Sequence, residues 1–195
     1  VAAGYLVSQL KDLGYSVSFL KDASFNAEEL KDGGYNGSQL KEGGFSASDL
    51  KTIHFSLSEL KEFGYNVSEL KSEYTTTQLK NIGFSLTELK EGGISASDLK
   101  DSGFVLSELK TVGFTVSDLK TLYTNVELQT AGFTANEMEE GGYTINDVLG
   151  IGYTYEEIKD AYQINSSVTK VSCSFDHVMV YMNNGKIYGS GYNGY

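Results

Sequence analysis

The sequence predicts a mostly helical protein: an α-solenoid, of right or left hand, built from about sixteen short two-turn helices and followed by a small β-hairpin segment. Three observations lead to this prediction. Leucine or another apolar residue recurs every ten residues along most of the chain. Helix-capping residues and glycine stand at fixed offsets from that apolar residue. The period stops after about residue 162, where β-branched and aromatic residues follow.

The apolar position is filled sixteen times, and successive copies lie ten residues apart except at two places, where they lie nine apart. An aromatic residue precedes it by five positions in every copy except one, where Ile94 takes its place. A helix of about seven residues is too short to be stable alone. Its apolar face must therefore be buried against neighbouring copies. The apolar residues are Leu10, Leu20, Leu30, Leu40, Leu50, Leu60, Leu70, Leu79, Leu89, Leu99, Leu109, Leu119, Leu128, Met138, Val148 and Ile158.

Each copy carries signals that start and end a helix, as residues 44–60 illustrate. Ser46 and Ser56 are N-cap residues, and an acidic residue three positions later completes a capping box. The aromatic residue before the cap and the leucine after it form a hydrophobic staple. Glycine in the left-handed conformation ends the helix. We therefore predict structural capping and core roles for Gly44, Phe45, Ser46, Asp49, Leu50, Ser56, Glu59 and Leu60.

The exceptions at the glycine position follow the same logic. Ser24 and His54 replace glycine in two copies, and histidine tolerates the left-handed region better than most residues. In the nine-residue copies the glycine itself is missing, before Tyr74 and Tyr123. We expect the chain to turn differently there.

A longer period of 49 residues is superimposed on the ten-residue repeat. Glu-Gly-Gly recurs at 42–44, 91–93 and 140–142, and the two deletions are also 49 residues apart. Five copies minus one residue make this block. Two interpretations remain open: duplication of a five-copy gene segment, or a superhelical turn completed by about five helices.

The charges also follow the repeat. Lysine follows the repeat leucine in the first twelve copies, and an acidic or amide residue generally precedes it, which suits the helix dipole. We expect a solvated face with ladders of ion pairs, in preference to a ligand-binding stripe. The chain has no arginine and a formal net charge of −11, so it lacks the basic face of a nucleic-acid binder. We predict no nucleic-acid partner.

Residues 165–195 differ in composition from the repeats. VTKVSCS and HVMVYM are rich in β-branched and aromatic residues, and Asn184-Gly185 is a strong hairpin-turn signal. We therefore predict two domains, a repeat solenoid over 1–164 and a β-hairpin segment over 165–195.

The tail resembles part of a regulator of chromosome condensation repeat, the blade unit of a seven-bladed β-propeller. This resemblance implies further blades beyond Tyr195 but no functional residue to transfer. Ser190 stands where that family usually has tryptophan. The repeats over 1–162 are similar to decapeptide tracts in proteins of giant DNA viruses, protists and bacteria. The residues that carry the tail resemblance are Cys173, His177, Asn184-Gly185, Ile187-Tyr188, Gly189-Ser190-Gly191 and Asn193.

The residue types needed for catalysis do not cluster. His54 and His177 are the only histidines, and each has a structural position in its pattern. Cys173 is the only cysteine, which excludes a multi-cysteine metal site. The serines, threonines and carboxylates recur as caps, and no Gly-Lys-Ser/Thr follows the Gly-Gly pairs. We predict no enzyme activity, no catalytic or metal site and no cofactor.

The N-terminus lacks the basic and apolar regions of a signal peptide, and no apolar stretch is long enough to span a bilayer. It also lacks methionine, which points to a processed end or a fragment. We predict no membrane insertion and leave localisation open, with a virion as one setting.

The leading hypothesis is a non-enzymatic structural or assembly scaffold, a component of a virion or another large particle. Its partners would be other proteins or further copies of itself. The alternative is a solenoid adaptor that binds a protein or peptide partner.

Overall fold

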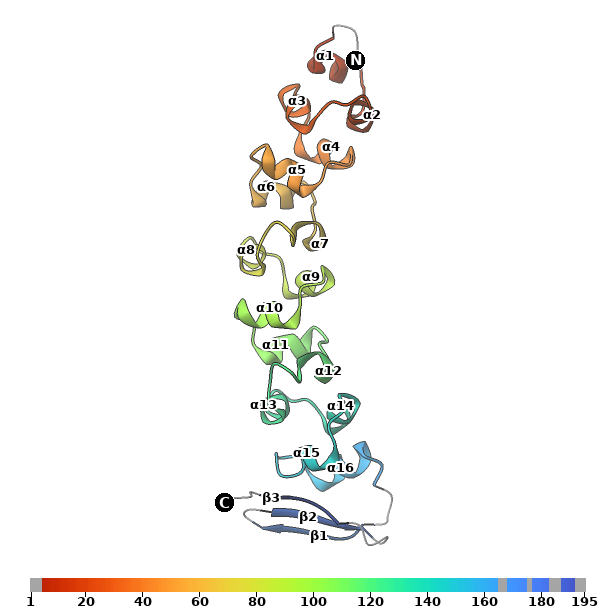
Figure 1. The fold of residues 1–195 in the computed structure, drawn as a ribbon, viewed down its shortest axis with the longest axis vertical. Helices are drawn as coiled ribbons and strands as arrows, with labels where there is room; N and C mark the ends of the chain where they lie inside the picture. Colours follow the sequence, from red (N-terminus) through yellow and green to blue (C-terminus); the bar gives the residue numbers. More distant parts are fainter. Residues whose placement is uncertain (1–4, 165–167, 175–176, 183–186, 192–195) are drawn as a thin grey trace. The chain divides into compact units, whose positions relative to one another are not determined.

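The structure is a computed structural model. It describes the backbone of residues 5–164, 168–174, 177–182 and 187–191, and the side chains of residues 5–164. The chain forms two compact units, Val1–Ser95 and Ala96–Tyr195, and each is considered by itself. Figure 1 shows that short helices follow one another in both units.

The first unit contains nine of the described helices, most of them six residues long. They are α1 (Val7–Asp12), α2 (Val17–Asp22), α3 (Ala27–Asp32), α4 (Gly37–Glu42), α5 (Ala47–Thr52), α6 (Leu57–Glu62), α7 (Val67–Leu70), α8 (Thr76–Asn81) and α9 (Leu86–Glu91).

The second unit contains seven described helices and three strands. The helices are α10 (Ala96–Asp101), α11 (Leu106–Thr111), α12 (Val116–Leu119), α13 (Asn125–Thr130), α14 (Ala135–Glu140), α15 (Ile145–Val148) and α16 (Tyr155–Ala161). The strands β1 (Val168–Ser174), β2 (His177–Met182) and β3 (Ile187–Gly191) pair antiparallel in the order β1-β2-β3. The predicted turn at Asn184-Gly185 lies outside the described residues.

The helices start at caps, as α3 shows. The backbone N–H of Glu29 donates to the Asn26 side chain at 2.9 Å, and the Glu29 carboxylate accepts the Asn26 N–H at 2.8 Å. This reciprocal pair satisfies donors that a helix start otherwise leaves open.

Most of the described helices end in a left-handed residue, as the glycine positions predict. After α3, Gly34 has a φ of 92° and donates its N–H to the Lys31 carbonyl at 2.9 Å. Tyr35 donates its N–H to the Leu30 carbonyl at 3.0 Å, which completes a Schellman motif. Ser24 and His54 have φ values of 73° and 68°, so the replacements adopt the same conformation. The aromatic residue thus closes one helix immediately before the next one starts.

The core of each unit is a row of buried repeat leucines, around which helices pack on their neighbours and on helices two apart in sequence. In the first unit α1 contacts α3, α2 contacts α4 and α7 contacts α9; in the second, α12 contacts α14 and α14 contacts α16. Side-chain hydrogen bonds between repeats join residues 19 to 28 positions apart. The suggestion that five helices complete a turn is therefore wrong. The coil repeats after about two helices, and the 49-residue period is not one turn of it.

The recurring Gly-Gly pairs have a packing reason. A Cβ added at Gly43 would overlap the side chain of Val17, and one added at Gly92 would overlap Val67. In the second unit Gly141 faces Val116 in the same way. Each of these valines opens a helix two repeats before its glycine. The first glycine of the pair therefore makes room for a neighbouring repeat, while the second supplies the left-handed turn.

The two nine-residue repeats turn differently, as expected. Their helices α7 and α12 have only four residues. Tyr74 donates its N–H to the Leu70 carbonyl at 3.1 Å, and Tyr123 donates to the Leu119 carbonyl at 3.0 Å. Neither turn contains a residue with positive φ. The missing glycine is thus replaced by a tighter turn directly after a shorter helix.

Candidate functional site

The residues with predicted capping and core roles lie around α5 and α6. At the start of α5, Asp49 donates its N–H to Ser46 Oγ at 3.1 Å, and its carboxylate accepts the Ser46 N–H at 2.8 Å. Phe45 is 8% exposed and Leu50 is fully buried. Gly44 precedes them with a φ of 84°. All of these groups stabilise the helix of their own repeat.

The following repeat shows what this arrangement does to the acidic residue. Glu59 accepts the Ser56 hydroxyl at 2.6 Å and the Ser56 N–H at 2.8 Å, and Leu60 is buried behind them. The side-chain hydrogen bond from Ser56, followed by the backbone one, lowers the pKa of Glu59. The corresponding side-chain and backbone hydrogen bonds from Ser85 lower the pKa of Glu88 at the start of α9. These carboxylates are ionised at neutral pH and engaged within their own repeats.

The repeat lysines form a connection that the sequence did not predict. Lys31 reaches from α3 to the end of α5, where Nζ donates to the Ile53 carbonyl at 2.7 Å and lies 4.3 Å from the centre of the Phe55 ring. In the second unit, Lys100 donates to the Leu122 carbonyl at 2.6 Å and lies 4.1 Å from the Tyr123 ring centre. One ammonium group thus contacts both a backbone carbonyl and an aromatic ring. We call these contacts the lysine ladder.

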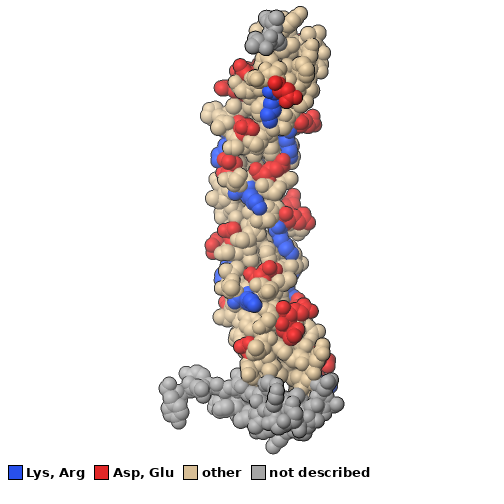
Figure 2. Space-filling model, turned by 45° about the vertical axis from the view of Figure 1, so that its right-hand side comes forward, with Lys and Arg blue, Asp and Glu red and all other residues tan. Residues whose placement is uncertain are grey.

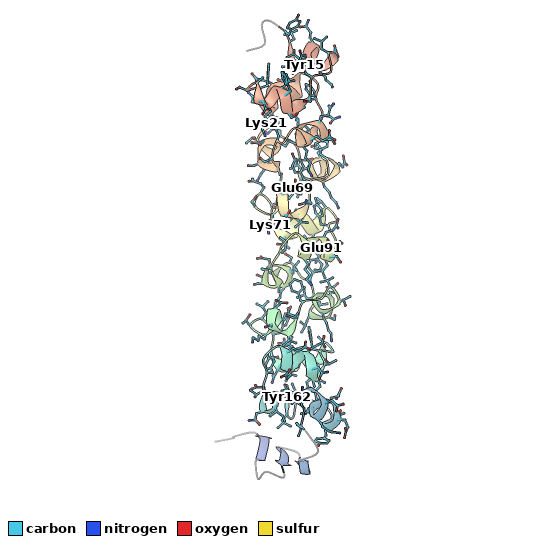
Figure 3. The ribbon with its side chains drawn as sticks, turned by 90° about the vertical axis from the view of Figure 1, so that its right-hand side faces the viewer. Tyr15, Lys21, Glu69, Lys71, Glu91 and Tyr162 are labelled. Carbon is cyan, nitrogen blue, oxygen red and sulfur yellow. The ribbon has the colours of Figure 1, made fainter. Side chains whose placement is uncertain are left out.

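The lysine ladder recurs along both units. Lys21, one of its members, is labelled in Figure 3. Each lysine meets the carbonyl that ends the helix two repeats later, where the helix dipole favours a cation. The described members with both contacts are Lys11, Lys21, Lys31, Lys41, Lys51, Lys61, Lys100 and Lys110.

The lysine ladder occurs together with the expected ion pairs between repeats. Cross-repeat ion pairs are found at Lys41–Glu69 (3.0 Å), Lys51–Glu73 (3.1 Å) and Lys110–Glu137 (3.0 Å), but each of these lysines also contacts a carbonyl and a ring. On the face seen in Figure 2, lysine and acidic side chains are interspersed. The signal for the ladder in the sequence is a fixed offset of 23 or 24 residues between each ladder lysine and an aromatic residue. It was missed because lysine was interpreted only with its own helix.

Tyrosine hydroxyls add a second type of connection between repeats. Tyr65 donates its hydroxyl to the Phe45 carbonyl at 2.6 Å, and Tyr35 donates to the Tyr15 carbonyl at 2.6 Å. Burial, with smaller contributions from nearby carboxylates, raises the pKa of Tyr65 to about 12. In the second unit Tyr153 bonds to the Phe133 carbonyl in the same manner. A phenylalanine at the same position of a repeat has the ring but no hydroxyl, so it cannot make this hydrogen bond to the carbonyl.

Two exposed valines break the repeat pattern in the second unit. Val105 occupies an N-cap position and is 57% exposed; Val126 occupies a position that is polar in the other repeats and is 51% exposed. Both line a groove of about 400 Å³. In the sequence, the signal is two separate departures from the repeat pattern, and the local pattern does not bring them together.

The remaining candidate residues lie in a helix-ending turn and in two paired strands. His54 fills a left-handed turn position after α5. His177 and Cys173 belong to strands whose side chains are not described. Among the described residues, no three His, Cys, Asp or Glu side chains gather as metal ligands would. Nor is any described helix both long and apolar enough to cross a membrane.

Comparison with known proteins finds two families. A model described as a decapeptide repeat region matches residues 4–73 and 64–125, and a regulator of chromosome condensation (RCC1) repeat matches residues 168–195. No curated protein and no solved structure matches the chain. The two family matches agree with both resemblances seen in the sequence.

Proposed function

We propose that this chain, which belongs to the decapeptide repeat family, acts as a structural or assembly scaffold rather than as an enzyme. The observation that carries this proposal is the lysine ladder. Lysine is the residue that could most readily give each repeat a binding role, yet the ladder lysines contact carbonyls and rings of the same chain. The repeated chemistry of the sequence is thus directed toward building the array.

The proposed organisation has two domains, a solenoid over 1–164 and a β-hairpin segment over 165–195 that corresponds to part of a propeller blade. The match of a regulator of chromosome condensation repeat to residues 168–195 supports the second. The capping and core roles proposed for residues 44–60 belong to the first. Their hydrogen bonds and burial support those roles.

The proposed setting is a large particle, such as a virion, in which copies of the chain contact one another or other structural proteins. Repeats that present similar polar surfaces suit a component used many times in a regular assembly. The adaptor function is the second candidate. One observation favours it: the exposed pair Val105 and Val126, where the surface differs from that of the neighbouring repeats.

The test is the association state of the purified full chain. We expect sedimentation velocity over a series of concentrations to show assembly that grows with concentration, and negative-stain imaging to show regular particles. The variant Leu60→Ala, which removes a fully buried side chain, controls for aggregation of unfolded chains, because regular assembly must weaken when the fold weakens. A chain that remains monomeric throughout would contradict self-assembly and favour the adaptor.

A further inference from the structure

The N-cap position of α11 departs from the repeat at a loss of stability. Val105 has no side-chain acceptor, so the Glu108 N–H bonds to the Val105 backbone carbonyl at 3.0 Å. In α9 the corresponding donor, Glu88 N–H, bonds to Ser85 Oγ at 3.2 Å. A valine at an N-cap is less stable than serine, threonine or asparagine. The valine is therefore unfavourable locally, and it also exposes an apolar side chain to water.

A second departure lies two repeats later. Val126 is the second residue of α13, where every other repeat has serine, threonine, asparagine or glutamate. Its side chain is exposed like that of Val105. Local sequence rules that fail without a compensating gain in stability are expected at functional positions.

The two departures meet in one place. Both valines line the groove of about 400 Å³, which α11 and α13 form together with the turn before α13. This volume is within the range that receives a side chain or a small ligand. The lining also includes Leu106, Ser107, Tyr123, Glu127, Thr130 and Ala131.

One carboxylate lines the groove, and one ammonium group lies beside it. Glu127 is the only charged residue in its lining. Hydrogen bonds from the Thr124 N–H and hydroxyl lower the pKa of Glu127, so its carboxylate is ionised at neutral pH. Lys100 also lies nearby, but its ammonium group is held by the Leu122 carbonyl and the Tyr123 ring. The chain as a whole carries a net charge of −11.

We propose that this groove is a docking site for a short segment of another protein in which apolar side chains are flanked by lysine or arginine. The valines offer the apolar contact, and Glu127 offers a carboxylate to the flanking cation. A second copy that docks groove to groove fits less well, because it would bring the two Glu127 carboxylates together. The proposal goes beyond the scaffold function and does not depend on self-assembly.

The test measures binding of short fluorescein-labelled peptides to the full chain by fluorescence anisotropy. The probe has leucines flanked by lysines; one control peptide replaces its leucines with serine, and another replaces its lysines with glutamate. We expect only the probe to bind, and added salt to weaken its binding.

The decisive variant is Val105→Ser with Val126→Ser, which returns both positions to the repeat pattern. We expect probe affinity to fall at least about tenfold, while the thermal midpoint stays the same or rises because a serine cap is restored. Unfolding therefore cannot explain the loss. Phe19→Glu is the matched control, because it likewise restores the repeat pattern at an exposed apolar residue, but in the first unit. That variant should bind the probe unchanged.

Three results would overturn the proposal. The first is equal binding of the serine control peptide, which would show a purely electrostatic contact. The second is unchanged probe affinity in the double-serine variant. The third is self-association of the wild-type chain that the double-serine variant loses, which would assign the groove to a second copy. Assembly that both chains share equally would instead leave the groove free and support the scaffold function separately.

Discussion

Helices α6 and α7 follow one another in the first unit but end in different ways. After α6, Gly64 has a φ of 86° and Tyr65 donates its N–H to the Leu60 carbonyl. After the shorter α7, no residue has positive φ, and Tyr74 donates directly to the Leu70 carbonyl. The two repeats differ in length by one residue, and this difference changes where the helix ends and how the chain turns after it.

Their contacts with earlier repeats are nevertheless the same. Lys41 bonds to the Gly64 carbonyl and lies 4.6 Å from the centre of the Tyr65 ring. Lys51 bonds to the Glu73 carbonyl at 2.9 Å and lies 4.7 Å from the centre of the Tyr74 ring. The link between repeats is thus kept while the local turn changes. The glycine is one means of bringing a carbonyl and a ring to the lysine, and a shorter helix is another.

The largest expected effect comes from the leucines that both kinds of repeat bury completely. Leu60→Ala and Leu70→Ala should each lower the free energy of unfolding by about 2–5 kcal/mol, because each leaves a cavity. Denaturant unfolding followed by circular dichroism measures this. A much smaller loss of unfolding free energy for Leu70→Ala would show that the nine-residue repeat is packed less well. The two kinds of repeat would then not be equivalent in the core.

The next effect concerns the glycine that faces a nine-residue repeat. Gly92→Ala should lower the free energy of unfolding by about 1–3 kcal/mol, because the new Cβ overlaps the side chain of Val67 at the start of α7. Adding Val67→Ala should recover part of this loss, and a double-mutant cycle measures the coupling. Additive losses would mean that the two residues do not share one space.

A smaller effect separates the two turns directly. Gly64→Ala should lower the free energy of unfolding by about 1–2 kcal/mol, because an L-residue is strained at positive φ. Glu73→Ala, which removes the side chain just before the aromatic residue of the nine-residue repeat, should lower it by less, since it loses only surface contacts with Lys51 and Ser48. Equal losses in denaturant unfolding would contradict the assignment of different turns.

Individual ladder lysines should contribute less. Lys41→Met and Lys51→Met keep most of the apolar stem and remove the cation from the ring and carbonyl. Each should lower the free energy of unfolding by about 0.5–1 kcal/mol. Similar losses, measured by denaturant unfolding, would show that the ladder works alike in both kinds of repeat. A loss of stability in only one of the two variants would show that the contribution of the lysine depends on the type of turn that it contacts.

The local part of this fold could be predicted from the sequence, but the contacts between repeats could not. Ser46, Asp49 and Gly44 act within ten residues, where capping and turn preferences leave little choice. The pairing of Lys31 with Phe55, or of Val17 with Gly43, depends on how many helices complete a turn. No local preference encodes that number. The 49-residue period suggested five, whereas the contacts join helices two apart.

The valines of the proposed docking groove could have been found in advance, since Val105 and Val126 contradict the repeat at their own positions. Their proximity could not, because it follows from the same two-helix spacing. Once that spacing is known, departures from the pattern two repeats apart become candidates for a shared surface.

The smallest expected effect is a loss of stability in acid, to which two types of carboxylate contribute. The Ser56 hydroxyl lowers the pKa of Glu59, and Lys51 lowers the pKa of Glu73, so both are below the ordinary value of 4.5. A lowered pKa contributes stability that is fully present above the unfolded-state pKa and is lost as the pH falls through the folded-state pKa. The denaturant midpoint of the wild-type chain should therefore fall below about pH 4.5.

Glu59→Gln and Glu73→Gln should each make this acid loss shallower, since neither glutamine takes up a proton. Salt then separates the two residues. The capping bond of Glu59 is a short contact with its own repeat and should change little when salt is added, whereas the exposed pair of Glu73 with Lys51 should weaken. If added salt changes the stability of both variants equally, both carboxylates act through long-range electrostatics. The proposed difference between the capping residue Glu59 and the turn residue Glu73 would then be wrong.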